Sequence, residues 1–382
     1  MTLNFDTRYR PVWAEIYVDR LRHNLKEVRR LVGPKVAIFA VVKADAYGHG
    51  AIQAAKAFVE AGANYLAVAL PEEGIELRQA GFTQPILVFG PYFPNQAQAF
   101  LDYDLMPTIA GSGALADLAA HVKGSGKTLK VHVKVDTGMS RVGVRHGEPA
   151  ADLIKKVADT EGLQLNGMYT HFAKADETDK QSALRQIDAF MNTIALVEQA
   201  GIKVPVKHMA NSAAIIDLPQ IYLDAVRPGI MLYGLYPSDE VHKDRVDLQP
   251  AMELKARVSH VKRVEAGTTI SYGGTYAPKV ISTIATIPVG YADGYSRILN
   301  GKGAEIIIRG HRYPVAGRIC MDQFMVDAGN DEIAIGDEAV LFGRQGDAFV
   351  SADEVASKLG TINYEVTCMV SRRVPRVYRE EQ

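Results

Sequence analysis

Eight short apolar runs alternate with helical patterns between residue 36 and about residue 235. The runs are typical of buried strands, and the segments between them carry the 3.6-residue periodicity of helices that cover a core with one face. The runs are 36–43, 65–70, 85–90, 105–110, 129–136, 163–171, 204–210 and 222–227. The clearest helical stripe comprises Ala183, Leu184, Ile187, Phe190, Met191, Ile194 and Val197.

Strands that alternate with helices pair in parallel, and eight such units close naturally into a (β/α)8 TIM barrel. An open, doubly wound sheet is the alternative, but an open sheet has no reason to stop at eight strands. The pattern therefore favours an α/β barrel.

The pattern changes after about residue 245. Apolar runs are then separated by Gly and charged turns, and long helical stripes are absent until near the end, which is typical of a smaller, mostly β domain. We expect a barrel over 1–245, with the first residues as candidates for pairing with the β domain, and a C-terminal β domain over 246–382. The later runs are Leu254–Val264, Ile281–Val289, Ile306–Ile308, Met325–Val326 and Ala339–Phe342.

Charge and cysteine content narrow the class of protein. The 43 basic side chains nearly balance the 44 acidic ones, which argues against nucleic acid or an anionic membrane as the main partner. Cys320 and Cys368 show neither metal-ligand spacing nor a disulfide framework. The segment Met1–Arg8 lacks an apolar core of signal-peptide length, and no run is long enough to cross a bilayer. We expect a soluble, cytoplasmic protein without a metal.

Function in such barrels gathers at the carboxyl ends of the strands. The first run ends at Lys43, and Tyr47 follows four residues later. A lysine at the mouth of a buried strand can be neutralised by burial and used as an amine nucleophile, for example toward pyridoxal phosphate. The lysine could equally reach water from the strand end.

The fifth strand places cations at the same mouth. Side chains alternate along a strand, so Lys134 shares the inward face with Lys130, His132 and Asp136. A buried lysine needs an anionic partner, a shifted pKa or chemical modification. Arg141 in the next loop adds a second cation, and two cations indicate an anion nearby. A simple Lys134–Asp136 pair with Arg141 on the surface is the alternative.

Strands six to eight end in polar residues as well. His171 ends the sixth strand, where a structural or a catalytic histidine is equally plausible. Ser212 follows the seventh strand in the position of a helix N-cap, and a helix N-terminus readily binds phosphate. Arg227 and Gly229 follow the eighth strand, and glycine lets the backbone approach a ligand closely. Loops after strands seven and eight commonly bind phosphate in barrels.

The string Lys43–Gly50 resembles the cofactor-lysine motif of the alanine racemases, which use pyridoxal phosphate. The resemblance covers both domains in order. It continues through Lys134–Arg141, Tyr169–Ala173, Ala210–Ala213, Arg227–Ile230, Ser271–Gly273, Gly290–Tyr295, Arg318–Gln323 and Ile362–Glu365. Ser140 stands where the family often has glycine, and we expect this change to be tolerated.

The resemblance implies a role for each matching residue. Lys43 would carry pyridoxal 5'-phosphate as a Schiff base, Arg227 would face the pyridine nitrogen, and His171 would lie between Arg227 and Tyr272. Tyr272 would come from the other subunit of a homodimer. Lys134 matches a position that is often carbamylated, and Arg141 with the backbone at Met321 would bind the carboxylate of alanine. The expected cofactor-binding set is Lys43, Tyr47, His171, Asn211, Ser212, Arg227, Gly229, Ile230 and Tyr364.

Racemisation removes the Cα proton from one face and returns a proton to the other, which two acid–base groups on opposite faces achieve most directly. Lys43 and Tyr272 would be these catalytic groups. A guanidinium is a poor proton donor, so Arg227 disfavours the protonated pyridine that would promote transamination. The expected product is D-alanine for peptidoglycan.

Three other functions fit the pattern less well. A non-catalytic carrier of pyridoxal phosphate needs the lysine and phosphate loops but no second base. An amino-acid decarboxylase of related fold would have an acidic partner for the pyridine nitrogen. A broad-specificity racemase is excluded only weakly.

Overall fold

The computed structural model describes residues 7, 9–123 and 125–380. The segment Met1–Arg8, on which the prediction of no signal peptide rests, lies outside the described residues except for Thr7. The chain forms two compact units. One consists of residues 20–46 and 51–249, and the other of the chain up to Asp19, Tyr47–Gly50 and the chain from Pro250 onward. Among the described residues, no helix combines the length and apolarity needed to cross a membrane.

The first unit is a closed barrel of parallel strands. Its strands neighbour one another in the order β5-β4-β3-β2-β10-β9-β8-β6, and β5 pairs with β6 to close the ring. The expected TIM-like barrel is confirmed, and the open sheet is wrong. The strands are β2 (Ala37–Val41), β3 (Tyr65–Val68), β4 (Ile86–Pro91), β5 (Leu105–Ile109), β6 (Leu129–Asp136), β8 (Leu163–Tyr169), β9 (Val206–His208) and β10 (Ala225–Val226), and a short β7 (Val144–Arg145) pairs with β6.

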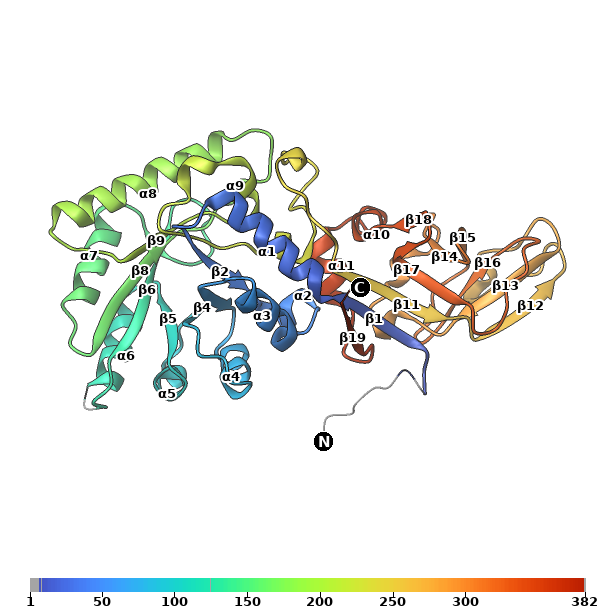
Figure 1. Ribbon diagram of the computed structural model, residues 1–382, viewed down its shortest axis with the longest axis horizontal. Helices are drawn as coiled ribbons and strands as arrows, with labels where there is room; N and C mark the ends of the chain where they lie inside the picture. Colours follow the sequence, from blue (N-terminus) through green and yellow to red (C-terminus); the bar gives the residue numbers. More distant parts are fainter. Residues whose placement is uncertain (1–6, 8, 124, 381–382) are drawn as a thin grey trace. The chain divides into compact units, whose positions relative to one another are not determined.

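Helices connect these strands and cover the outside of the barrel (Figure 1). They are α1 (Val18–Val32), α2 (Lys43–Tyr47), α3 (Ala51–Glu60), α4 (Pro71–Gln79), α5 (Ala97–Asp102), α6 (Ser112–Val122), α7 (Glu148–Ala158), α8 (Gln181–Gln199) and α9 (Ser212–Asp217). Short 3-10 turns are η1 (Pro94–Gln96), η2 (Pro219–Ile221), η3 (Ile230–Tyr233) and η4 (Lys243–Arg245).

The buried face of α8 differs from the predicted stripe. Leu184 and Met191 are 47% and 42% exposed, whereas Gln186 and Thr193 are buried. Both polar residues have hydrogen-bond partners that permit burial. Thr193 Oγ1 donates to the Ala189 carbonyl (2.8 Å) and accepts from the Gly147 amide (2.9 Å). A stripe built from apolar residues alone could not include them.

The second unit is mostly β, as expected. Its sheet runs β12-β13-β16-β15-β14-β17-β11-β1-β19, and β18 pairs with β17. The early strand β1 pairs antiparallel with β11, and the predicted run Leu254–Val264 is divided between β11 and β12. The strands are β1 (Val12–Tyr17), β11 (Met252–Arg257), β12 (His260–Val264), β13 (Ser282–Ile287), β14 (Glu305–Ile308), β15 (His311–Ala316), β16 (Phe324–Asp327), β17 (Glu338–Gln345), β18 (Ala348–Val350) and β19 (Arg376–Arg379). The helical elements are η5 (Tyr272–Gly274), η6 (Tyr291–Asp293), η7 (Arg297–Leu299), α10 (Ala352–Leu359) and α11 (Asn363–Met369).

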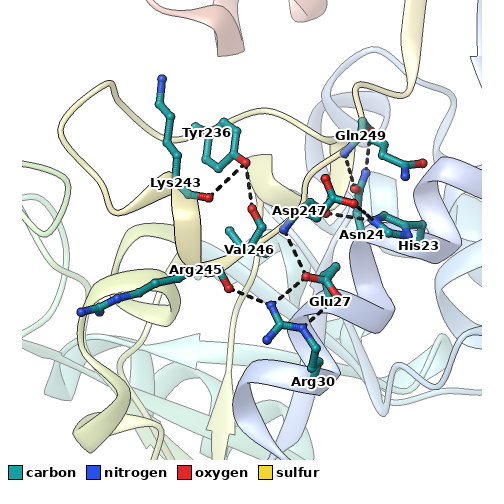
Figure 2. A network of polar contacts seen from close by, with 10 residues as sticks. All are labelled: His23, Asn24, Glu27, Arg30, Tyr236, Lys243, Arg245, Val246, Asp247 and Gln249. Carbon is teal, nitrogen blue, oxygen red and sulfur yellow. Dashed lines mark hydrogen bonds and ion pairs between the residues drawn. The ribbon is translucent and has the colours of Figure 1, made fainter.

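The last segment of the barrel unit is tied to α1 by a polar network (Figure 2). Asn24 is fully buried at its centre. Its Nδ2 donates to the carbonyls of Leu232 (3.2 Å) and Gln249 (2.9 Å), and its Oδ1 accepts from the Gln249 amide (2.8 Å). Farther along α1, Glu27 accepts from the Asp247 amide at 3.1 Å. The network fixes the chain where it leaves the barrel.

We expect Asn24→Ala to lower the free energy of unfolding by about 2–3 kcal/mol, because buried backbone groups would lose their hydrogen-bond partners. Urea unfolding followed by circular dichroism measures this change. Asn192→Ala, on the exposed face of α8, is the matched control and should change stability by less than about 0.5 kcal/mol. Equal effects of the two substitutions would contradict a structural role for the network.

Candidate active site

Lys43 begins a turn of unusual backbone at the carboxyl end of β2. Residues 44–47 all have φ between 52° and 54°, a left-handed conformation that costs residues other than glycine about 1–2 kcal/mol each. Glu73 stabilises the start of this turn, since its carboxylate accepts from the Ala44 amide (2.6 Å) and the Ala69 amide (2.7 Å). The Asp45 carboxylate accepts from the Ala51 amide (2.7 Å). Backbone strain held in this way is typical of a functional site.

Lys134 is buried, as strand alternation predicts, but the same prediction is wrong for Lys130, which is exposed because it lies near the start of β6. Lys134 is 8% exposed, and its Nζ lies 4.5 Å from the centre of the Tyr169 ring. Burial, reinforced by Arg227 and Arg141, holds the pKa of Lys134 well below its usual range. Asp136 directs its carboxylate to the amides of Gly138 and Ser140, at 3.0 Å each. Lys134 and Asp136 therefore form no direct ion pair, although the charge of Asp136 counters the lowering of the Lys134 pKa, and Arg141 is exposed as that alternative expected.

Arg227 is the buried centre of the barrel mouth. It is 3% exposed, and burial lowers its pKa to about 10, so it stays protonated near neutrality. Its guanidinium donates to the carbonyls of Thr170 (2.6 Å) and Met209 (3.1 Å) and lies 3.4 Å from Nδ1 of His171. Burial, followed by the charges of Arg227, Lys134, Arg141 and Lys43, holds the pKa of His171 well below its usual range. His171 is therefore neutral and accepts from Arg227 at Nδ1.

A chain of buried imidazoles extends from Arg227 into the barrel. Nδ1 of His208 accepts from Arg227 (3.0 Å), because a guanidinium can only donate. Nε2 of His208 then donates to Nδ1 of His132 at 3.0 Å. Nε2 of His132 consequently carries its proton and needs an acceptor. The structure places the amide nitrogen of Asn166, itself a donor, 2.9 Å from this atom. A ring N–H requires the amide oxygen at this place, which a half-turn of the Asn166 side-chain amide supplies. This chain fixes the tautomers beneath the site.

These imidazoles predict that stability falls in acid. Burial lowers the pKa of His132 from 6.5 to about 3, so between these values the unfolded chain binds the proton and the folded chain does not. As the pH decreases through this window, the free energy of unfolding should decrease as well, by up to about 1.4 kcal/mol per pH unit for each such histidine. Urea unfolding between pH 7 and 5 should give a shallower slope for His132→Gln than for the parent. The exposed-site control His260→Gln should keep the parent slope, and equal slopes for all three would contradict this account.

The loops after β9 and β10 meet at Ser212. The N-cap of α9 is Asn211 and not Ser212, because the extended Asn211 accepts from the Ala214 amide at its Oδ1 (3.0 Å). Ser212 Oγ instead accepts from the amides of Gly229 (2.9 Å) and Met231 (3.5 Å). Ile230 is fully buried beside them at the start of η3. Because Ser212 Oγ accepts from both amides, the hydrogen of its hydroxyl is the donor that this cluster can direct to an anionic group.

Arg141 and Ser140 lie in the exposed loop after β6. Ser140 has a φ of 57°, a left-handed conformation in which glycine would be relaxed, and the chain accommodates serine there at a cost of about 1 kcal/mol. Gln186 of α8 supports the neighbouring backbone, since its Nε2 donates to Thr137 Oγ1 and to the His171 carbonyl, at 3.0 Å each. Gln186 is not predictable from the sequence, because a glutamine inside a helical pattern carries no signal of its own. Glu73 is not among the predicted residues, although the pair Glu72-Glu73 after Pro71 is a typical helix start.

The remaining candidates belong to the β unit. Tyr47 and Tyr364 approach each other, with ring centres 6.0 Å apart. Tyr272 is 66% exposed and Met321 is 53% exposed. The Met321 carbonyl accepts from the Ala292 amide at 3.1 Å, and a Cβ at Gly290 would lie only 2.2 Å from that oxygen. The backbone at Met321 is therefore closely held while its side chain faces outward.

The comparisons with known proteins cover both units. Residues 16–237 match the family model for the alanine racemase N-terminal domain, and residues 251–378 match the model for the C-terminal domain. An alanine racemase from Desulforamulus reducens is 50% identical over 369 residues, which cover 96% of this chain and 99% of the relative.

Solved structures agree with these matches. An alanine racemase from Clostridium difficile 630 has a TM-score of 0.93 at 45% identity, covering 97% of this chain and 96% of the other. One from Bacillus anthracis with bound L-Ala-P has a TM-score of 0.92 at 39% identity, with coverages of 97% and 96%.

Proposed function

This chain belongs to the alanine racemase family, and we propose that it racemises alanine by a two-base mechanism with pyridoxal 5'-phosphate bound through Lys43. It is an enzyme, an isomerase that interconverts L- and D-alanine. The observation that best supports the proposed mechanism is the arrangement of the barrel mouth. Lys43 begins a strained turn there. The pKa of His171 is lowered by burial and by the charges of four nearby cations, Arg227, Lys134, Arg141 and Lys43.

The donor set of the barrel mouth fits this cofactor. Lys43 supplies the amine for its aldehyde. Ser212 Oγ, the backbone of Gly229 and Ile230, and Asn211 would hold its phosphate. Tyr47 and Tyr364, which approach each other in the β unit, are proposed as further phosphate contacts. Bound pyridoxal phosphate supplies an electron sink for the pair left on Cα when the substrate loses its proton.

Arg227 would face the pyridine nitrogen and limit the chemistry to racemisation. Its pKa of about 10 keeps it charged, and its contacts with Thr170 and Met209 fix its orientation. A protonated guanidinium gives up its proton poorly, so Arg227 would not protonate a pyridine nitrogen that it faces. Protons should then return to Cα, and transamination should be rare.

Two residues would move the Cα proton. The Lys43 amine would serve one face, and Tyr272 of the partner subunit would serve the other. Tyrosine ordinarily titrates near 10, so it needs hydrogen bonding to act near neutrality. Neutral His171, whose Nδ1 accepts from Arg227, has its Nε2 proton available to stabilise the phenolate.

Substrate binding would use Arg141 and the held backbone at Met321 for the carboxylate. We further propose that Lys134 is carbamylated. Carbamylation needs a neutral amine, which the lowered pKa of Lys134 provides, and the resulting anion would orient Arg141. No metal ion is invoked in this mechanism.

We propose that the active form is a homodimer with shared sites. The Tyr272 side chain is 66% exposed, so a partner subunit can reach it. We also propose the domain division 1–245 and 246–382. The D-alanine produced would supply peptidoglycan.

One assay tests the proposed function and its alternatives. The purified dimer, supplied with pyridoxal phosphate, should convert L-alanine to D-alanine and the reverse, approaching an equal mixture from both sides. Binding of the cofactor without turnover would favour a carrier. Equal kcat/KM values for alanine, serine and larger amino acids would favour a broad-specificity racemase.

A further inference from the structure

The residue before Tyr272 has a backbone conformation that is almost confined to glycine. Ser271 has φ 64° and ψ −178°, and Gly273 and Gly274 have φ of 74° and 55°. Glycine reaches such angles without cost, whereas a Cβ makes them strained. Ser271 directly precedes η5, and its side chain must make a favourable interaction that offsets this strain.

The Ser271 hydroxyl supplies that reason through its contacts. Its Oγ donates to the Arg318 carbonyl at 2.6 Å and lies 3.6 Å from Cys320 Sγ. The loop that holds these partners comes unusually close, since a Cβ on Gly317 would lie 2.6 Å from the Ile270 carbonyl oxygen. The hydroxyl therefore ties the Tyr272 loop to the loop that leads to Met321.

The base of the Tyr272 loop is rigid. The Ile270 amide donates to the Tyr276 carbonyl (2.9 Å), and these two residues form an isolated β-bridge that closes the loop. Ile270 packs in a core with Ile284 and Ala316. Tyr276 packs against this core, and its hydroxyl donates to Asp327 at 2.6 Å.

The Arg318 side chain packs against the tip of the loop. A Cβ on Gly273 would lie only 2.9 Å from the Arg318 guanidinium, so this side chain packs closely on the backbone that follows Tyr272. Tyr272 itself projects into solvent at 66% exposure. A rigid base and a tethered backbone thus aim an otherwise exposed phenol.

We propose that Ser271 is a positioning residue, whose hydroxyl tether and strained backbone hold the Tyr272 phenol at the face of the substrate where it transfers a proton. This inference rests on the proposed function, in which Tyr272 is the second base. The tether explains why serine is kept where glycine would be relaxed. Loss of the tether should slow proton transfer at Tyr272 and leave proton transfer at Lys43 intact.

Two substitutions separate positioning from folding. Ser271→Gly removes the hydroxyl and relieves the strain, so its thermal unfolding temperature should equal or exceed that of the parent while kcat falls about tenfold to a hundredfold. Ser271→Ala removes the hydroxyl, keeps the strain and should lose activity similarly. Ser357→Ala, on the exposed side of α10, is the control and should keep both properties. Full activity in Ser271→Gly would overturn the proposal.

Isotope effects of Cα-deuterated L- and D-alanine distinguish a misplaced Tyr272 from a general loss of activity. In the direction in which Tyr272 removes the deuteron, a slower Tyr272 step makes that removal more rate-limiting, and the isotope effect should grow. In the other direction Lys43 removes the deuteron and Tyr272 returns a solvent proton, so the isotope effect should shrink. Both Ser271 variants should show these opposite changes, and changes in the same direction, or none, would overturn the proposal.

Tyr272→Phe separates failure of this inference from failure of the proposed function. If Tyr272→Phe alters the two isotope effects and the Ser271 variants do not, Ser271 has no positioning role, although Tyr272 remains the base. If Tyr272→Phe also leaves the rates and both isotope effects unchanged, Tyr272 is not a base and the two-base proposal fails as well.

Discussion

Lys43→Ala should lower kcat for alanine racemisation by at least about 10⁴-fold and abolish the visible absorbance of the lysine-bound cofactor. Both effects have one cause, since the same amine binds the cofactor and then acts as a base. The turn at residues 44–47 supports this expectation, because its left-handed backbone is held by Glu73 and Asp45 and gives Lys43 a fixed starting point. Absorbance spectra before and after borohydride, together with the rate of racemisation, measure both effects.

Lys56→Ala is the matched control, because Lys56 is an exposed lysine of the helix that follows the turn. It should retain the parent spectrum, the borohydride-trapped cofactor and the parent rate. A visible absorbance that persists in Lys43→Ala and remains reducible by borohydride would mean that another lysine holds the cofactor.

Tyr272→Phe should lower kcat by about 10²–10⁴-fold while leaving the cofactor spectrum unchanged. The substitution removes only the phenolic oxygen, so the ring packing of the exposed loop is retained. Rates in both directions and the spectrum of the variant measure this effect. Tyr9→Phe, at a position that is 87% exposed, should behave as the parent.

Mixing the two inactive variants tests whether Tyr272 serves the partner subunit. A heterodimer of Lys43→Ala and Tyr272→Phe subunits has one site with Lys43 from one subunit and Tyr272 from the other, so activity should return after the subunits exchange. If Tyr272 acts within its own subunit, both sites of the heterodimer are defective and no activity returns.

The barrel followed from the sequence because its signal is repeated. Eight apolar runs and the intervening helices were each weak evidence, but their number limited the closed architectures available. Alternation along β6 correctly predicted that His132 and Lys134 are buried, since a two-residue period is a strict geometric property of strands, but it wrongly included Lys130, because alternation does not show where along a strand burial begins. Strand ends were less certain, as shown by β10, which spans only Ala225–Val226 of the run 222–227.

Features set by tertiary contacts could not be predicted. The left-handed turn after Lys43 consists of residues that give no local signal for positive φ, and Glu73 stabilises it from 29 positions away. Gln186 is buried because Thr137 and the backbone of His171 accept its hydrogen bonds. Ser212 was the predicted N-cap of α9, but Asn211 caps the helix instead. The Ser212 hydroxyl accepts from the Gly229 amide in the loop after the next strand, a contact that the sequence does not reveal.

The origin of the new Cα hydrogen tests the two-base account most directly. L-alanine is racemised in deuterium oxide, and both enantiomers are analysed by mass spectrometry before one tenth of the substrate is consumed. Two bases on opposite faces predict that the D-alanine formed carries solvent deuterium at Cα, while the remaining L-alanine keeps its proton. D-alanine that retains the substrate proton in a substantial fraction of molecules would contradict the account, because a single base would then have carried that proton from one face to the other.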